Sequence, residues 1–371
     1  MDLYIDRDEL SRGLAHVQGV VERRSTTAVG SHVLLHARSG EGLRMTATDT
    51  EIAFMGDAPA NVTANGALAV DAANLFQIVR ALPEATVRLG VSSGRLEVRS
   101  GKSVFRIPGL PAEDYPPLPP FDPRSTARIG QSALRRIIDQ THFSVSTDEV
   151  RYGLNGAHLQ EVTVDGQSHL RMVATDGHRL SASQAPVEGA LAVPHRMLVP
   201  RKALTVLRRL LETDDSHVEI AFGDQAIRVS RPGASFWFRM LDGEFPDYES
   251  VLPTDHRHEV TARGADLMSA LRRVLIVVQD RSRAVRFAFG AEELGIDVQN
   301  ADRGEVKESL PIAHQGEDLV TGFNARYLYD VLQALESERV TLHMAHALAP
   351  CLLRDPDQSG AFFVVMPMRL D

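Results

Sequence analysis

The sequence is poor in cysteine and lysine. Cys351 is the only cysteine among the 371 residues, and Lys102, Lys202 and Lys307 are the only lysines. A single cysteine excludes an internal disulfide and a metal site built from several thiolates, so we expect Cys351 to be a small, semi-buried hydrophobic residue. Because lysine is so scarce, nearly all of the 40 basic residues are arginines.

Long apolar runs are also absent. No stretch approaches the roughly 18 consecutive apolar residues that indicate a membrane-spanning helix. Residues 1–7 lack the basic segment, followed by an apolar one, that marks a secretory signal. A hydrophobic content of 43% and a charged content of 24% are typical of a globular chain. We therefore expect a cytoplasmic protein of two or three domains with no membrane partner.

Motifs for common cofactors and catalytic metals are missing too. The chain contains no glycine-rich phosphate loop, no dinucleotide-binding fingerprint and no histidine pair at metal-ligand spacing. Its 14 histidines are scattered, and its carboxylates form no cluster that predicts a two-metal site. We therefore expect no cofactor, no metal and no catalytic residue.

The charge is unevenly distributed. The net charge of −9 by itself argues against a nucleic-acid partner. Acidic residues gather in predicted turns such as 212–215, whereas basic residues occur in pairs on segments with helical periodicity. These pairs are 135–136, 201–202, 208–209 and 272–273. Two interpretations fit: an acidic protein with one basic face, or charged helix faces that are only solvated.

What the sequence does contain is a threefold repeat of two apolar ladders, at intervals of about 130 residues. Each ladder has a spacing that places its residues on one face of an α-helix. The first ladder is Leu10, Leu14, Val17 and Val21, then Leu134, Ile138, Thr141 and Val145, then Leu267, Leu271, Val274 and Val278. The second is Leu75, Ile78 and Leu82, then Leu204, Leu207 and Leu211, then Leu328, Val331 and Leu335. Two ladders in the same order, three times over, predict three copies of one domain.

Segments with strand character follow each predicted helix. Runs such as 32–37 and 43–48 are separated by turns rich in glycine and serine. Two helices with antiparallel strands in every copy predict an α+β fold. Similar joints close the first two copies, at 110–116 and 241–248, and proline-bearing linkers follow them. The predicted domains are residues 1–125, 126–255 and 256–371.

Some ends of elements can be predicted as well. Asp71 is a suitable N-cap for the second helix of the first copy. That helix should end at Leu82, because proline follows it. In the third copy we expect the last strand to run from Ala361 to Met368.

Residues 171–181 of the second copy contain the residue types of a hydrolytic active site. Asp176, His178 and Ser181 could be proposed as the acid, base and nucleophile of a hydrolase. Three members within six residues do not converge easily, however, and a triad is defined by its geometry in space. Asp176-Gly177 more simply forms a tight bend between strands. The first copy has Asp49 in the equivalent place but lacks the Gly-His-Arg that follows Asp176.

The C-terminal segment is apolar, whereas chain ends are commonly polar. Met366-Pro367-Met368 would make a poor core but an adaptable binding surface. Segment 364–370, the string 174–180 and the joint Phe245-Pro246-Asp247-Tyr248 together resemble the β sliding clamps of bacterial DNA polymerase III. The likeness extends over the full length and includes the threefold repeat.

The resemblance implies a non-catalytic processivity factor of the replicative DNA polymerase, in the cytoplasm and associated with the nucleoid. In this family two subunits, each with three domains of the DNA-clamp fold, close head to tail as a homodimeric ring around double-stranded DNA. Basic helices would face the phosphates and an acidic exterior would face away, so DNA contacts would be independent of sequence and sensitive to salt. The implied DNA contacts are Arg24, Tyr152, Arg201 and Lys202. The implied dimer interface is Phe105 and Ile107 against Ile276 and Val277 of the other subunit.

The resemblance also implies a peptide-binding cleft between the second and third domains. There the polymerase α subunit, the clamp loader, other polymerases and mismatch-repair proteins insert short linear motifs, whose hydrophobic side chains enter apolar pockets. The implied cleft residues are Leu154, Thr175, Gly177, His178, Arg179, Leu180, Pro246, Val251, Val364, Val365, Met366, Pro367, Met368, Arg369 and Leu370.

Three positions depart from the family pattern. Asp371 follows the leucine at which many relatives end, Ser250 stands where some have arginine, and Gly153 stands where some have a second aromatic residue. These departures are also compatible with a second interpretation, in which the chain is a specialised second copy of the clamp. A hydrolase using the Asp176–His178 loop and a monomeric DNA-binding adaptor are further alternatives. The hydrolase predicts turnover that His178→Ala abolishes, and the adaptor predicts a single-chain mass in solution.

Overall fold

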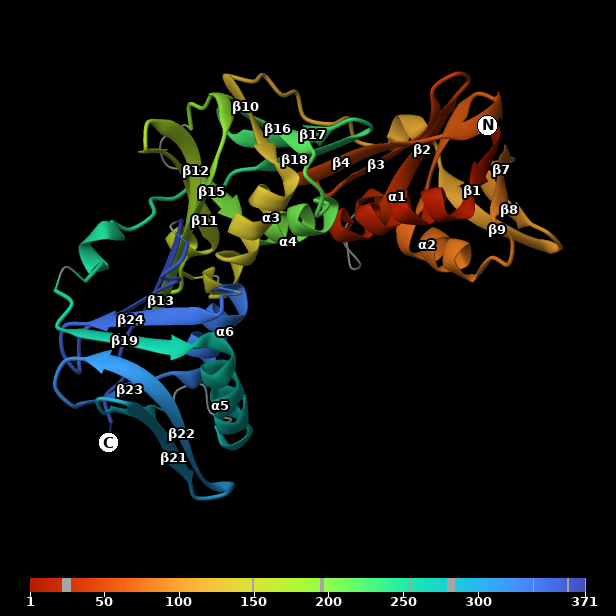
Figure 1. The fold of residues 1–371 in the computed structure, drawn as a ribbon. Helices are drawn as coiled ribbons and strands as arrows, with labels where there is room; N and C mark the ends of the chain where they lie inside the picture. Colours follow the sequence, from red (N-terminus) through yellow and green to blue (C-terminus); the bar gives the residue numbers. More distant parts are fainter. Residues whose placement is uncertain are drawn as a thin grey trace. The chain divides into compact units, whose positions relative to one another are not determined.

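The computed structural model describes residues 1–21, 28–148, 150–193, 197–253, 255–278, 284–335, 337–358 and 360–370 (Figure 1). One order of elements occurs three times in them: a strand, a helix, a run of strands, a second helix and three final strands. The first copy has β1 (Asp2–Asp6), α1 (Arg7–Val20), β2 (His32–Arg38), β3 (Gly42–Thr48), β4 (Ile52–Ala58), β5 (Ala60–Ala64), β6 (Gly66–Asp71), α2 (Ala72–Ala81), β7 (Thr86–Ser92), β8 (Arg95–Ser100) and β9 (Ser103–Leu110). The second has β10 (Ser125–Gly130), α3 (Gln131–Asp139), β11 (Gly156–Val164), β12 (Gln167–Thr175), β13 (Arg179–Pro186), β14 (Glu188–Ala190), β15 (Leu198–Pro200), α4 (Arg201–Leu210), β16 (His217–Phe222), β17 (Ala226–Arg231) and β18 (Ala234–Arg239). The third has β19 (His258–Arg263), α5 (Gly264–Val277), β20 (Val285–Phe289), β21 (Glu293–Asn300), β22 (Gly304–Gln315), β23 (Leu319–Phe323), α6 (Ala325–Leu335), β24 (Arg339–Met344), β25 (Cys351–Arg354) and β26 (Ala361–Val365). The predicted α+β class and threefold repeat are confirmed.

The helices follow the apolar ladders. Leu10 and Leu14 of α1 are fully buried, as are the ladder residues of α6 to within a few per cent. The predicted cap of α2 is present, because Asp71 Oδ1 accepts a hydrogen bond from Asn74 N at 2.7 Å. The same helix ends at Ala81, before Leu82 and Pro83. Cys351 is completely buried, and burial raises the pKa of its thiol.

Two predicted elements are shorter in the structure. The ladder through Val145 predicts one continuous helix, but α3 ends at Asp139. Thr141 Oγ1 donates a hydrogen bond to Ile137 O at 2.6 Å, so a side chain satisfies a carbonyl at the end of the helix. Thr141 and Val145 remain buried beyond that end. The last strand was predicted to reach Met368 but ends at Val365, because a proline two residues later cannot donate to a strand ladder.

The strands form two continuous antiparallel sheets, and each crosses a boundary between copies (Figure 1). In the first sheet β18 of the second copy pairs with β4 of the first, from Ile52↔Phe238 to Gly56↔Ala234. In the other sheet β26 of the third copy pairs with β13 of the second, from Arg179↔Val365 to Ser183↔Ala361. The two junctions therefore use equivalent strands in the same register.

The chain divides into two compact units, and the division passes through the second copy. One unit comprises residues 1–132, 187–194 and 202–240, and the other comprises 133–186, 195–201 and 241–371. Within the first unit α1 packs closely on α4, since a Cβ on Gly19 would lie 3.3 Å from both methyl groups of Val206. None of the helices in the described parts of the chain is long and apolar enough to cross a membrane.

His16, on α1, makes the stability of the first unit depend on pH. Burial lowers the pKa of its imidazole to about 4, below the ordinary value near 6.5. The neutral ring packs edge-on against Phe54, with the ring centroids 5.5 Å apart. Because the unfolded chain takes up a proton near pH 6.5 and the folded chain does not, stability is present above that pH and is lost as the pH falls toward 4.

We expect urea unfolding to show this loss. Between pH 7.5 and pH 5 the free energy of unfolding should fall by about 2 kcal/mol through His16 alone. Trp237, the only tryptophan, lies on β18 in the same unit and reports the transition by fluorescence. His16→Gln should flatten the pH dependence by about that amount. An unchanged pH dependence in this variant would contradict the assignment.

Candidate functional site

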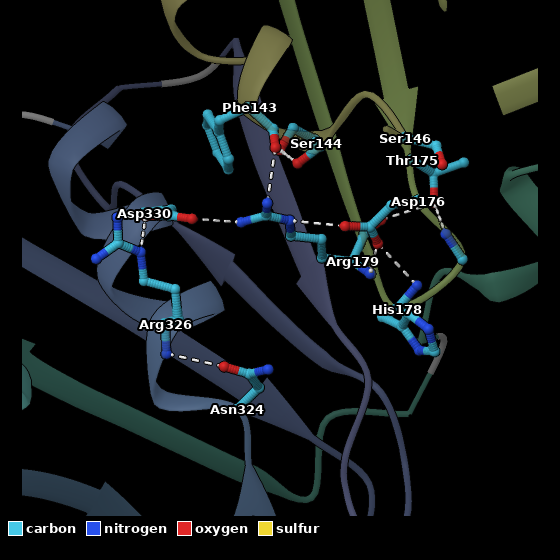
Figure 2. Close-up of polar contacts among 12 residues, drawn as sticks. Phe143, Ser144, Ser146, Thr175, Asp176, His178, Arg179, Asn324, Arg326 and Asp330 are labelled. Atoms are coloured by element: carbon cyan, nitrogen blue, oxygen red, sulfur yellow. Dashed lines mark hydrogen bonds and ion pairs between the residues drawn. The ribbon is translucent and has the colours of Figure 1, made fainter. Parts of the chain in front are cut away.

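The turn between β12 and β13 is held by its own side chains (Figure 2). Asp176 Oδ1 accepts hydrogen bonds from the backbone N–H groups of His178 at 2.9 Å and Arg179 at 3.0 Å. Thr175 Oγ1 donates to Arg179 O at 2.6 Å and accepts from Gly177 N at 3.1 Å. Gly177 has a φ of +87°, a conformation that favours glycine. The predicted tight bend is confirmed.

The first copy builds the same turn between β3 and β4. Asp49 Oδ1 accepts from two backbone N–H groups, one of them Ile52 N at 2.6 Å. Thr48 Oγ1 donates to Ile52 O at 2.9 Å, and Thr50, with φ of +79°, takes the place of Gly177. Because the turn recurs without a histidine or arginine, its Thr-Asp pair is structural.

The second-copy turn does not form a hydrolytic triad, so the hydrolase interpretation is wrong on geometry. Ser181 is fully buried, and its Oγ lies 2.6 Å from Ser144 Oγ. Asp176 uses its carboxylate to cap the turn, while the His178 ring stacks on Tyr327 with centroids 6.4 Å apart. Among the described residues no group of three or more His, Cys, Asp or Glu is arranged to hold a metal ion.

The C-terminal segment lies against this turn. After β26, Met366 N donates to His178 O at 2.9 Å, and Met368 N donates to Gly322 O of β23 at 2.8 Å. Pro367, which has no N–H, lies between these two hydrogen bonds. The segment is thus held by the second copy at one point and by the third copy at the next. Residues 175–180 and 364–368, predicted to act together, are adjacent in the structure.

Gly322 provides the space that the C-terminal segment needs. A Cβ at this position would lie 2.5 Å from Met368 O and 3.0 Å from Leu370 Cδ2. A side chain would therefore displace the backbone of the segment. Sequence analysis missed Gly322, and nothing in the local sequence marks it, because the close approach comes from a segment 46 residues away.

An apolar cluster lies behind the turn and joins the other predicted residues to it. Leu180, Val364 and Tyr248 are buried in this cluster, and Val251 packs against it. Tyr248 OH accepts a hydrogen bond from Gln160 Nε2 at 2.5 Å, which fixes the joint between the second and third copies. Pro246 is exposed beside this joint.

The loop that carries Leu154 contacts the same turn. Leu154 is half-buried in the short 3-10 helix Tyr152–Leu154. Arg151 Nη1, immediately before it, donates to Asp176 O at 3.1 Å. A Cβ on Gly153 would lie 2.7 Å from Glu244 O, so an aromatic side chain cannot be accommodated there in this backbone conformation. Asp371, another departure from the family pattern, lies outside the described residues.

Comparison with known proteins identifies the family. Sequence profiles of the DNA polymerase III β subunit match its N-terminal domain at residues 1–119, its central domain at 128–247 and its C-terminal domain at 249–369. The β sliding clamps of Caulobacter vibrioides and Escherichia coli are 36% and 34% identical, each over the whole of both chains. The chain belongs to the β sliding clamp family. Its function is therefore that of a DNA sliding clamp, a non-catalytic subunit of DNA polymerase III.

Solved clamps have the same fold. The Caulobacter crescentus clamp, with polyethylene glycol in a putative β-motif tethering region, superposes with a TM-score of 0.93 at 34% identity, covering 100% of this chain and 99% of that one. The Bartonella birtlesii clamp, bound to griselimycin, superposes with a TM-score of 0.94 at 34% identity over all of both chains.

The predicted DNA contacts that lie within the described residues are all exposed. Tyr152 is 74% exposed. Arg201 and Lys202 open α4 and are both exposed, and Lys202 Nζ forms an ion pair with Asp49. Arg24 lies outside the described residues.

The clamp's predicted dimer residues differ in their exposure within the single chain. Ile276, in the last turn of α5, is 68% exposed, Phe105 of β9 is 39% exposed and Val277 is half-buried. Ile107 is only 3% exposed in the single chain. Phe105 and Ile107 share one face of β9, opposite the buried Val98 and Leu96, so the alternation of the strand does not separate them.

Proposed function

We propose that two chains close head to tail into a ring around duplex DNA, with domains divided near residues 125 and 256. The observation that supports this proposal is that the same kind of strand pairing joins the first copy to the second and the second copy to the third. In each case the final strand of one copy pairs with the strand that follows the Thr-Asp turn of the copy before it. β9 has in the first copy the place that β18 and β26 have in theirs, and β22 has in the third copy the place of β4 and β13.

Both of these strands have an open edge. In the described part of a single chain, β9 pairs with β8 along 103–108 but with β6 only at 109–110. Likewise β22 pairs with β21 along 304–311 and reaches β19 only at 312–315. An unpaired strand edge is a ready template for a second chain. A third junction, made between chains, would join β9 of one subunit to β22 of its partner.

Apolar side chains gather at these open edges. Phe105 lies on β9, and Ile276 lies at the end of α5, beside β22. The turn before β22 is tied to that helix end, because Asn300 Nδ2 donates to Val277 O at 3.4 Å. Exposed apolar residues beside an open strand edge suit an obligate interface.

The DNA-facing surface would be the exposed faces of the helices. The pairs 135–136, 201–202, 208–209 and 272–273 lie on α3, α4 and α5, whose apolar faces are turned into the cores. Arginine–phosphate contacts are independent of sequence, and their affinity falls as salt rises. Such contacts permit sliding, while closure of the ring retains the clamp on DNA, in the cytoplasm and at the nucleoid.

The turn at 175–180 and the segment 364–370 would form the partner cleft. It would accept short linear motifs of the polymerase α subunit, the clamp loader, other polymerases and mismatch-repair proteins. Support comes from Met366 and Met368, which are partly exposed and adaptable in shape. The other implied residues, among them Leu154, Pro246, Val251 and Arg369, lie in the same compact unit. We propose that griselimycin, bound in the Bartonella relative, occupies this cleft.

The ring predicts topological retention on DNA. After loading by the clamp loader, we expect the chain to stay on nicked circular DNA through gel filtration at 0.5 M salt (about the range in which phosphate contacts are weak). Linearising the DNA should release it, because the ring can slide off an end. Equal retention on both DNA forms would contradict the mechanism. It would favour the monomeric adaptor.

A further inference from the structure

Arg179 is almost completely engaged within the chain. Its side chain is 11% exposed, and its three donor groups reach three different elements (Figure 2). Nη1 donates to Asp330 Oδ2 of α6 at 2.7 Å, and Nη2 donates to Phe143 O at 2.7 Å. Nε donates to Asp176 Oδ2 at 3.1 Å. The guanidinium also stacks over Tyr327, with Cζ 4.5 Å from the ring centroid.

We propose that Arg179 is a positioning residue: through its ion pair with Asp330, it aligns the two walls of the cleft and does not itself bind the partner peptide. The inference rests on the proposed cleft. It assigns a role to Asp330, which sequence analysis missed. The available signal was a carboxylate in α6 at the position where α4 has the apolar Val206.

The charges in this network balance. Asp330 also pairs with Arg326 at 3.2 Å on its own helix. Two arginines, Arg179 and Arg326, thus face two carboxylates, Asp176 and Asp330. Arg179 therefore has little uncompensated charge with which to attract an acidic peptide, and three of its five N–H donors are already used.

The junction between the first and second copies lacks this ion pair. Ile52 occupies the place of Arg179, three residues after the turn aspartate, and pairs with Phe238 as Arg179 pairs with Val365. Val206 occupies the place of Asp330. Both residues are buried apolar side chains, 2% and 3% exposed. Apolar packing has no direction, whereas a guanidinium fork fixes the angle between the groups it joins. The Arg179–Asp330 ion pair, which has a fixed direction, therefore occurs at the junction between the second and third copies, where the proposed cleft lies.

The network leads directly to the C-terminal segment. Arg179 follows His178, whose carbonyl accepts the hydrogen bond from Met366 N. The His178 ring also stacks on Tyr327 of α6, with the ring planes 18° apart. Moving α6 relative to the turn would move both contacts. The position of Met366 thus depends on the Arg179–Asp330 pair.

Two substitutions separate positioning from direct binding. Asp330→Asn keeps the shape but removes the charge, and Arg179→Lys keeps the charge but has one nitrogen in place of the three that reach Asp330, Phe143 and Asp176. In calorimetric titration with griselimycin, we expect each variant to bind about tenfold more weakly. The double variant should bind about as weakly as either single one, because both remove the same interaction. Normal binding by Asp330→Asn with weak binding by Arg179→Lys would overturn the proposal, since Arg179 would then contact the ligand.

A stability control and a ligand-free measurement complete the test. Val274→Ala, in the buried core of α5, should lower the melting temperature without changing griselimycin affinity; equal weakening would assign the effect to stability alone. Hydrogen exchange at the Met366 amide should be about tenfold faster in Asp330→Asn. Unchanged exchange would overturn the inference whether or not griselimycin binds. Failure of the wild-type chain to bind griselimycin, with faster exchange in the variant, would count only against the proposed cleft.

Discussion

A chain that ends at Val365 is expected to lose partner binding and remain folded. Its last strand, β26, ends at that residue, so pairing with β13 and β25 is kept. The truncation removes Met366 and Met368, their hydrogen bonds to the two cleft walls, and Leu370. We expect at least about 100-fold weaker binding of griselimycin, and of fluorescein-labelled peptides that tile the polymerase α subunit, since a few central residues dominate such sites.

The matched control is a chain that ends at Leu370, which lacks only Asp371. It should bind normally and melt at the same temperature as the full chain. Circular dichroism and sedimentation should find both truncated chains folded and dimeric. Unchanged affinity in the chain that ends at Val365 would exclude the segment from the cleft.

Ile276→Asp is expected to separate the dimer into folded single chains. Because the side chain is 68% exposed in the single chain, the substitution should leave the free energy of unfolding of each subunit nearly unchanged. In the dimer it would bury an unpaired carboxylate at an apolar contact, which we expect to weaken association at least about 100-fold. Sedimentation velocity at micromolar concentration should find the mass of one chain, and loader-dependent retention on circular DNA should be lost.

Leu348→Asp provides the matched control for this experiment. Leu348 is also strongly exposed, at 61%, and belongs to the same domain, but it lies between β24 and β25. This variant should sediment as the mass of two chains. Ile107→Asp should behave differently from both, because Ile107 is buried within its own chain and its substitution should destabilise the fold itself. A dimeric Ile276→Asp protein would place the interface elsewhere.

The repeat and the turn were predictable because both depend on local chemistry. Apolar spacing marked α1, α2, α4, α5 and α6, and Asp176-Gly177 marked a bend whose hydrogen bonds join residues at most four positions apart. Prediction was wrong where a distant contact or a missing donor decided the outcome. β26 stops before Pro367, which has no N–H to donate, and the apolar spacing that marks α3 continues past the end of that helix at Asp139. Ile107 and Phe105 are both apolar and share one face of β9, and only the tertiary structure separates the buried residue from the exposed one.

The sequence by itself determined that the chain has three similar α+β domains and belongs among the sliding clamps. Periodicity, turn residues and motif strings are local properties, and they survive in the linear order of residues. Only the tertiary structure decided that equivalent strands join the copies in the same register, and that β9 and β22 keep open edges. It also decided that Arg179 donates hydrogen bonds to Asp330, Phe143 and Asp176. The Arg179–Asp330 contact joins residues 151 positions apart, and its geometry depends on how whole domains pack.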